Sequence, residues 1–376
     1  MRYPSIDILR MVAIFVMVFV HFGENLSGYY AFFAGLGAPL FAFLTGVSYH
    51  LWATGLEERG LPESEITKVS VRRGLFVFSV GIAFNVLVWL PSDTFNWDVL
   101  TLIGVGLVLL NLLRHQPLIV SFSIILMMLT LSPFLRMIVG YDQYWQNRYY
   151  DPAMTFSDTW IGFFVAGYFP LFPWLVLPIG GFITANLLFP GGFSRTTKPV
   201  ALWKLLSTGG CFLLVSQSIN ALNHWYPTVQ SVAIFGKWTM YPPTTVYLLG
   251  MLGANLILLS SMHYLIDRHP SRSGHPWLVV PKRFSQYSFT IYVFHHLVHV
   301  WPMWIYAEIK GLETTYYWSK ALPLRVSLCL AVVFLVFTYF LLRALGDKRS
   351  IGVEACMRWL CDEQPHKKSS ERARND

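Results

Sequence analysis

Charged side chains are scarce in this sequence. Only 13% of its 376 residues are Asp, Glu, Lys or Arg, whereas 55% are hydrophobic. A soluble domain carries about 25% charged residues, so the composition excludes an ordinary soluble protein and indicates a membrane protein with many spans. Cysteine is also scarce. The four cysteines fall in predicted spans or near the C-terminus, and their spacing indicates neither a disulfide framework nor a zinc site.

The hydropathy profile predicts an all-α, polytopic membrane helix bundle of about ten transmembrane helices. Long apolar runs occur at residues 6–23, 32–53, 72–90, 99–113, 118–135, 161–188, 201–219, 241–265, 286–305 and 325–343. The sixth run is long and contains three prolines, so we expect it to be kinked or partly re-entrant. The runs form one expected domain over residues 1–361. We expect the polar tail, residues 362–376, to be disordered and attracted to anionic lipid.

The distribution of positive charge places both termini in the cytoplasm. The net charge of +8 would suit a nucleic-acid partner, but 22 of the 28 Lys and Arg residues fall on the cytoplasmic side of the ten-span topology. Such a bias is the positive-inside rule of membrane proteins, so we expect lipid contacts and no nucleic acid. No cleavage site follows the first span, which we expect to be retained. No internal repeat is visible, which weakens an inverted-repeat transporter interpretation.

The first span contains ionisable residues that a membrane helix rarely tolerates. A charged side chain at bilayer depth costs roughly 2.5–3.5 kcal/mol, so such residues are candidates for function. Arg10 and His21 are eleven residues apart, which places them on one helix face about 16 Å apart along the axis. Asp7 precedes Arg10 by three residues and is expected to pair with it. Glu24 follows His21 by one turn and is expected to orient its imidazole.

A second concentration of ionisable residues lies in the ninth span. Tyr292, His295, His296 and His299 fall within YSFTIYVFHHLVH. His295 and His299 are four residues apart on one helix face, the spacing of a metal pair, but the segment offers no third ligand or carboxylate. Interhelical hydrogen bonding or a second active-site histidine is favoured, and we expect no metal.

Four further residues are predicted to contact donor or substrate. Arg72 and Arg73 lie at the cytoplasmic mouth of the third span, where they act as topology signals or as phosphate contacts for a nucleotide donor. Asn85 and Asp98 are polar residues near the outer ends of their spans, where interhelical hydrogen bonding is the alternative. Aromatic residues crowd two outer loops, 140–160 and 220–240. They suit a membrane interface or a surface that stacks on sugars or lipid headgroups.

The ordered motifs resemble a known superfamily. SIDILRMVAIFVMVFVHF resembles the first-helix signature of transmembrane acyltransferases, an arginine followed by a histidine, which is shared by the acyltransferase-3 family and by bacterial proteins related to heparan-alpha-glucosaminide N-acetyltransferase. The similarity to the second group continues in APLFAFLTGVSYHL, RRGLFVFSVGIAFN, DVLTLIGVG, GYFPLFPWLVLPIGG, MYPPTTVYLLGMLG and YSFTIYVFHHL.

The resemblance implies an integral membrane O- or N-acyltransferase, of a bacterial inner membrane, that takes an acyl group from cytoplasmic acyl-CoA. Acetyl-CoA is the expected donor, and a carbohydrate or glycolipid on the outer face is the acceptor. His21 would be the catalytic histidine and Arg10 would organise the site. The animal lysosomal enzymes differ: they carry asparagine at the position of His21 and have their catalytic histidine near Phe32. A transporter or flippase that uses Asp7, Arg10 and His21 as a relay is the alternative, and a non-catalytic sensor is the third class.

Overall fold

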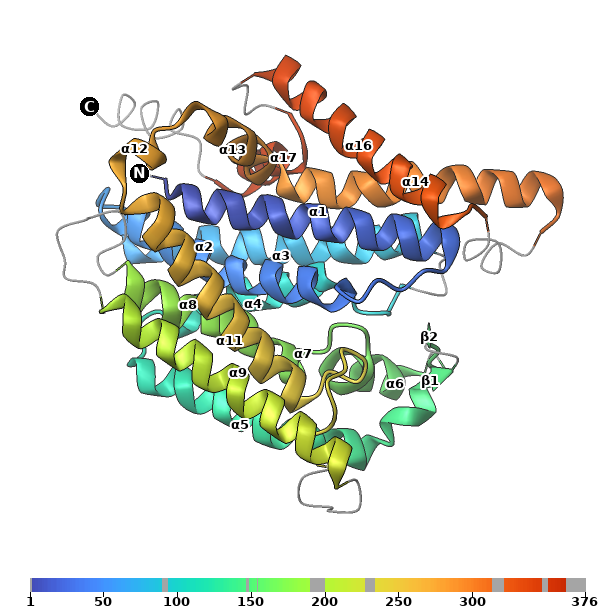
Figure 1. The fold of residues 1–376 in the computed structure, drawn as a ribbon, viewed down its shortest axis with the longest axis horizontal. Helices are drawn as coiled ribbons and strands as arrows, with labels where there is room; N and C mark the ends of the chain where they lie inside the picture. Colours follow the sequence, from blue (N-terminus) through green and yellow to red (C-terminus); the bar gives the residue numbers. More distant parts are fainter. Residues whose placement is uncertain are drawn as a thin grey trace, which may run out of the picture.

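The computed structural model is a bundle of helices that run between two ends of the molecule (Figure 1). It describes residues 2–89, 94–146, 149–153, 155–189, 200–226, 234–312, 321–346 and 351–362. The only described strands are two residues long, so the predicted all-α class is confirmed.

The helices and strands follow one another in a simple order along the chain. The first half contains α1 (Pro4–Ser27), η1 (Ala34–Leu36), α2 (Gly37–Glu57), α3 (Glu63–Val88), α4 (Val99–Leu113), α5 (Leu118–Val139), η3 (Tyr141–Tyr144), β1 (Trp145–Gln146), β2 (Tyr149–Tyr150), α6 (Phe156–Ile161), η4 (Gly162–Ala166), α7 (Leu171–Trp174) and α8 (Val176–Leu188). The second half contains α9 (Leu202–Trp225), α11 (Thr245–Met262), η5 (His263–Asp267), α12 (Pro270–Ser273), η6 (Pro276–Leu278), α13 (Val279–Gln286), α14 (Ser288–Lys310), α16 (Leu324–Leu345) and α17 (Val353–Cys361).

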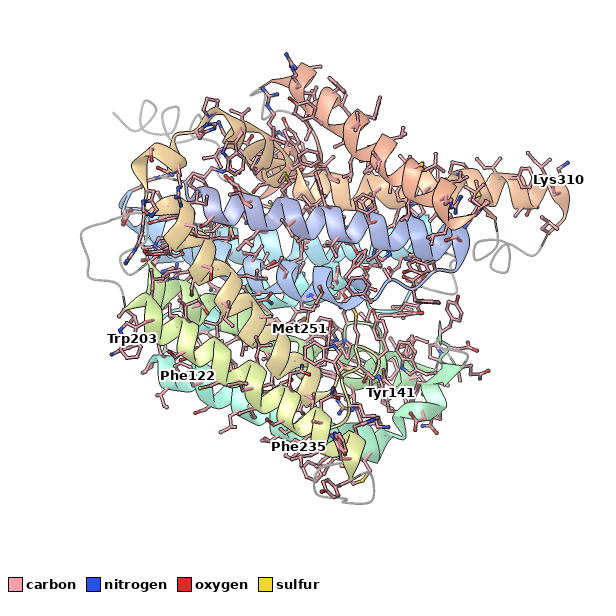
Figure 2. The ribbon with its side chains drawn as sticks, in the orientation of Figure 1. Phe122, Tyr141, Trp203, Phe235, Met251 and Lys310 are labelled. Carbon is pink, nitrogen blue, oxygen red and sulfur yellow. The ribbon has the colours of Figure 1, made fainter. Side chains whose placement is uncertain are left out.

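Each of the ten predicted spans falls on helix. Within the described residues, eight helical segments are long and apolar enough to cross a membrane. The other two predicted spans correspond to α4, which is apolar but has 15 residues, and to α14, which has 23 residues and carries three buried histidines. Trp203 and Lys310, at opposite ends of the molecule, show how far the bundle extends (Figure 2). The chain is therefore an integral membrane protein.

The sixth span is broken where its prolines predict a break. The helix of α6 passes into the π-helical turn η4 and ends at Gly167, whose ψ of −173° is extended. Pro170 is the N-cap of the short helix α7, and α8 completes the span. Of the most apolar stretch of Phe156–Leu188, 83% is buried, so the interrupted backbone is enclosed by protein rather than facing lipid.

Glycine lets pairs of helices approach closely. A Cβ atom added to Gly46 of α2 would lie 1.8 Å from the carbonyl oxygen of Pro178 in α8, and one added to Gly181 would lie 1.9 Å from that of Phe43. No side chain fits at such distances, so the two backbones are in direct contact. Equivalent reciprocal contacts join α3 to α4 through Gly74 and Gly104, and α9 to α11 through Gly209 and Gly253.

The first helix lies inside the bundle, as its ionisable residues predict. α1 packs against α2, α11, α13, α14 and α16. α13 lies near the N-terminal end of α1, where Arg2 donates a hydrogen bond to the carbonyl of Lys282. η3, β1 and β2 form an aromatic cluster with residues of α6 and η4 and with Tyr168. The fold thus brings the ionisable side chains of α1 next to the histidines of α14 in the interior of the bundle.

Candidate active site

The histidines of α14 form the buried centre of the candidate site. His295, His296 and His299 are at most 4% exposed. Nδ1 of His295 lies 2.6 Å from the carbonyl oxygen of Tyr292, and Nδ1 of His299 lies 2.5 Å from the carbonyl oxygen of His295. A carbonyl oxygen only accepts, so Nδ1 carries the proton in both rings. This leaves Nε2 of each ring as an acceptor that faces away from the helix.

His21 of α1 points into this cluster. Its ring centroid lies 4.5 Å from that of His296 and 5.4 Å from that of His295. A ring nitrogen of each of the three residues lies within 4.8 Å of one from each of the other two. His21 makes no hydrogen bond to any described residue, and it is only partly buried. Three imidazoles from helices that are 274 residues apart in sequence therefore meet at one point.

Asn25 is a site residue that the sequence interpretation missed. It lies one turn beyond His21, and its amide nitrogen is 2.9 Å from Nε2 of His299. Because Nε2 is the acceptor nitrogen of that ring, the amide donates to it. The i+4 spacing from His21 was the available signal. Asn25 thus positions His299 and joins the C-terminal end of α1 to the middle of α14.

Tyr292 and Asp98, both predicted site residues, are brought together by the fold. The Tyr292 hydroxyl donates to Oδ2 of Asp98 at 2.6 Å. Asp98 is the N-cap of α4, and its Oδ1 accepts the backbone N–H of Leu100 at 2.9 Å. Phe84 packs against both Tyr292 and His296, with centroids at 5.4 and 5.2 Å. The hydrogen bond between Tyr292 and Asp98 therefore holds α14 against α4 beside the histidine cluster.

Arg10 lies on α1 between the N-terminus and His21, and its hydrogen-bond partners are neutral. Its guanidinium donates to the hydroxyl of Ser48 in α2 and, at 3.2 Å, to the hydroxyl of Ser285 in α13. None of the salt bridges within the described residues includes Arg10. Its positive charge is therefore held between three helices without a bound carboxylate.

The predicted pairing of Asp7 with Arg10 is wrong. Asp7 instead accepts two hydrogen bonds from Arg2, at 2.5 and 2.7 Å. Arg2 precedes the helix and folds back over its first turn, where its planar fork matches both carboxylate oxygens. Helical spacing considers only neighbours within the helix, so it could not reveal this competitor.

Glu24 does not orient His21 as expected. Within the described part of the chain its carboxylate makes no hydrogen bond to the imidazole. It lies instead within electrostatic range of Tyr241, in the aromatic region at the outer end. Phe32, the position at which the animal enzymes carry their histidine, is 95% exposed beyond the end of α1. Among the described hydrogen bonds, therefore, no α1 carboxylate contacts the clustered imidazoles, and Phe32 lies at the surface.

The four predicted donor or substrate contacts outside α14 have different surroundings. Arg73 forms a two-point ion pair with Asp362, at 2.7 and 2.9 Å, and stacks over Trp52 at 4.6 Å. Arg72 beside it is exposed. Asn85 lies near the outer end of α3, where its amide donates to the carbonyl of Thr94 at 3.0 Å. Only Asp98 joins the histidine cluster, through Tyr292.

A buried carboxylate that the sequence interpretation missed holds the beginning of α14. Glu354 of α17 accepts the backbone N–H of Phe289 at 2.7 Å and that of Thr290 at 3.1 Å, and also the Thr290 hydroxyl. These are the free donors at a helix N-terminus, where negative charge is favourable. α17 thus caps the helix that carries the histidines.

The fold and this centre define a polytopic membrane protein with a buried cluster of histidines from α1 and α14 and with an arginine on α1 that forms no salt bridge within the described residues. Comparison with known families gives a more specific answer. The model of the heparan-alpha-glucosaminide N-acetyltransferase catalytic domain matches residues 2–215. The match covers more than half of the chain, so the chain belongs to this family of membrane acetyltransferases, as the sequence motifs predicted.

The matched part includes Arg10, His21 and Asp98 but ends before α14. No curated protein matches the chain. The family therefore establishes the transferase class, and it leaves the roles of the individual residues to be argued from their geometry.

Proposed function

We propose that this protein transfers an acetyl group from cytoplasmic acetyl-CoA to a carbohydrate-type acceptor on the outer face of a bacterial inner membrane. Residues 1–361 would form the single catalytic domain, and residues 362–376 a cytoplasmic tail. His21 would be the general base. The observation that carries the proposal is the position of His21: it faces two buried imidazoles and makes no hydrogen bond to any described residue.

The charge on Arg10 supports an anionic donor that enters from the cytoplasmic side. Ser48 and Ser285 each accept one hydrogen bond from the guanidinium but carry no charge that would neutralise it. A guanidinium favours planar contact with phosphate or carboxylate oxygens. Arg10 and His21 are about 16 Å apart along α1. In the proposal, Arg10 organises the site on the CoA side, Arg72 and Arg73 meet the nucleotide phosphates, and the thioester lies near His21.

The reaction follows from the free lone pair of a neutral imidazole. His21 takes the proton of the acceptor hydroxyl or amine as the acceptor oxygen or nitrogen attacks the thioester carbon. The new C–O or C–N bond forms, the C–S bond breaks, and the CoA thiolate leaves. The imidazolium then returns its proton to that thiolate or to water. Direct transfer needs no second nucleophile. An acyl-histidine intermediate is the variant, and ping-pong kinetics would identify it.

The aromatic cluster at the outer end supports a sugar-like acceptor. Trp145 stacks on Tyr241 with centroids 5.2 Å apart and an interplanar angle of 28°. Tyr168 meets both rings edge-on, at 5.0 and 5.4 Å. Aromatic faces with polar tips combine apolar contact with hydrogen bonding. Tyr241 also lies within electrostatic range of Glu24, one turn from His21.

The first experiment replaces the base. We expect purified His21→Ala to lose acetyl-CoA-dependent transfer to an α-glucosaminide or to an extract of membrane glycolipids, while its thermal melting temperature stays near that of the wild type. A general base contributes about 10²–10⁴-fold to the rate. His115→Ala is the matched control, because the His115 side chain is half exposed and its hydrogen bonds within the described residues join it to Arg114 and Glu63. Full activity in His21→Ala would exclude the assignment.

The second experiment tests the donor without needing the acceptor. A ligand that binds only the folded state stabilises it by about 2.7 kcal/mol at a hundred times its Kd. We expect acetyl-CoA to raise the melting temperature of the detergent-solubilised protein more than free CoA or palmitoyl-CoA does. If none of the three stabilises the protein, and proteoliposomes carry glycolipid across the membrane without consuming acetyl-CoA, the protein is a flippase and not a transferase.

A further inference from the structure

The three clustered imidazoles are also a set of metal ligands. We propose that His21, His295 and His296 bind one divalent transition-metal ion, and that the bound metal blocks acyl transfer. The binding itself is independent of the proposed function. The inhibition rests on it, because it assumes that His21 is the base.

The ring nitrogens supply the first argument. Nδ1 of His295 is occupied by the Tyr292 carbonyl, and its Nε2 is buried without a hydrogen-bond partner. Nδ1 of His296 is likewise buried without a partner. An unsatisfied buried polar atom costs about 1–3 kcal/mol. A metal ion would satisfy these nitrogens together with one from His21.

The second argument is the way the ligands are held. A histidine that binds metal usually donates its other ring N–H to a carbonyl or carboxylate, which fixes the tautomer and the ring orientation. His295 does this through Tyr292, at 2.6 Å. The structure also changes the ligand set expected from the sequence. His299 is excluded, because both of its nitrogens are engaged, by the His295 carbonyl and by Asn25. His21, from a distant part of the chain, supplies the missing third ligand.

The chemistry of the ligands indicates the kind of metal. Neutral imidazoles suit zinc, copper, iron and nickel, whereas calcium and magnesium prefer oxygen. Three protein ligands leave a fourth position open. In a tetrahedral zinc site with Zn–N distances of about 2.0–2.1 Å, ligand nitrogens are about 3.3 Å apart. The present nitrogens all lie within 4.8 Å of one another, so binding requires them to move closer by up to about 1.5 Å.

Metal binding and base catalysis use the same electron pair. A coordinated imidazole nitrogen has no lone pair with which to take a proton, and the remaining ring nitrogen then carries hydrogen. With metal bound, His21 can no longer deprotonate an acceptor. Zinc should therefore act as a reversible inhibitor, and a chelator should restore activity.

The binding experiment uses the full-length protein in detergent, stripped of metal with a chelator. Zn²⁺ is titrated in competition with a chromophoric chelator, and Co²⁺ is added separately to record its visible absorption. We expect one ion per chain and the intense visible bands of four-coordinate cobalt. His21→Ala and His296→Ala should each weaken zinc binding at least tenfold, whereas His115→Ala should bind as the wild type does. Melting curves identify any variant that has lost its fold.

Three results decide the proposal. Failure of wild-type protein to bind zinc below about 10 µM, or equal affinity in the variants and the wild type, overturns the site. If zinc binds as expected but a chelator abolishes acetyl transfer instead of increasing it, the inhibitory part is overturned. If zinc binds at the three histidines and no donor binding is found, the metal site stands and the proposed transferase function fails.

Discussion

Removal of the Glu354 carboxylate should loosen the helix that carries the site histidines. Glu354 is 8% exposed and accepts two backbone N–H groups and one hydroxyl at the start of α14. In Glu354→Ala the N–H of buried Phe289 loses its partner. Hydrogen bonds to a charged group contribute about 1.5–3 kcal/mol each, and loss of an N-cap typically costs about 1 kcal/mol. We expect the contact between α17 and α14 to weaken by about 2–4 kcal/mol in total.

Cys361 at the end of α17 reports on this contact. It is 2% exposed, whereas Cys211, Cys329 and Cys356 are exposed and can be replaced by serine. Burial also raises the pKa of the Cys361 thiol, which lowers its thiolate fraction at a given pH. Release of α17 removes both protections. A change of about 2 kcal/mol should speed maleimide labelling of Cys361 about 30-fold or more, since 1.36 kcal/mol is a factor of ten.

Glu308→Ala is the matched control, because Glu308 is an exposed glutamate near the outer end of the same helix. It should label at the wild-type rate. Glu354→Gln keeps one acceptor oxygen without the charge, so its Cys361 should be labelled at a rate between those of Glu354→Ala and Glu308→Ala. Labelling of Glu354→Ala at the wild-type rate would refute the conclusion that this carboxylate holds α17 against α14.

Three further predictions concern packing, the Tyr292 contact and the donor. Gly209→Ala should destabilise the protein by about 1–3 kcal/mol in a thermal melt, because the added Cβ would lie 2.8 Å from a backbone oxygen of α11. Gly210→Ala is the control and should leave the melting temperature unchanged, because a Cβ at Gly210 has no atom within 4 Å. Tyr292→Phe should lose about 1–2 kcal/mol through its bond to Asp98, and a double-mutant cycle with Asp98→Asn should show coupling; additive effects would contradict it. Arg73→Gln should change stability by less than about 1 kcal/mol, because its ion pair is partly exposed, yet raise the KM for acetyl-CoA; an unchanged KM would remove it from the donor site.

The membrane-spanning architecture was predictable because the bilayer fixes how long an apolar helix must be. The prolines at 170, 173 and 178 predicted a broken sixth span; the break is observed between Gly167 and Pro173, whereas Pro178 lies in the first turn of α8. Asp98 was singled out at the start of a span, and the structure makes it the N-cap of α4. These features depend on residues that are close together in the sequence, so the sequence alone predicts them.

The composition of the site was only half predictable, because it depends on contacts between residues that are far apart in the sequence. The sequence marked His21 and the α14 histidines as unusual residues in apolar helices, but no spacing rule connects residues 274 positions apart. The same limit explains Asp7, whose partner Arg2 lies outside the helix. It also explains Glu354, which sits in a short segment near the C-terminus with no apolar run to mark it as buried. Hydrogen-bond partners that tertiary folding brings together can be identified only from the three-dimensional structure.

The hydrogen bonds of the four site histidines separate their roles. His299 has both nitrogens engaged and is at most a support. His295 has one nitrogen engaged and is fully buried, so it cannot exchange its proton with an acceptor that arrives from outside. His296 is 2% exposed and is enclosed by Phe84 and Trp89.

His21 alone among the four is partly exposed, and it makes no hydrogen bond to any residue that the structure describes. A general base must reach its substrate and must have a free lone pair. His21 is partly exposed and has a free lone pair, whereas its three neighbours are buried, so His21 is the histidine that we propose as the base. The same lone pair is available to a metal ion, so the proposed base and the proposed metal ligand are the same side chain.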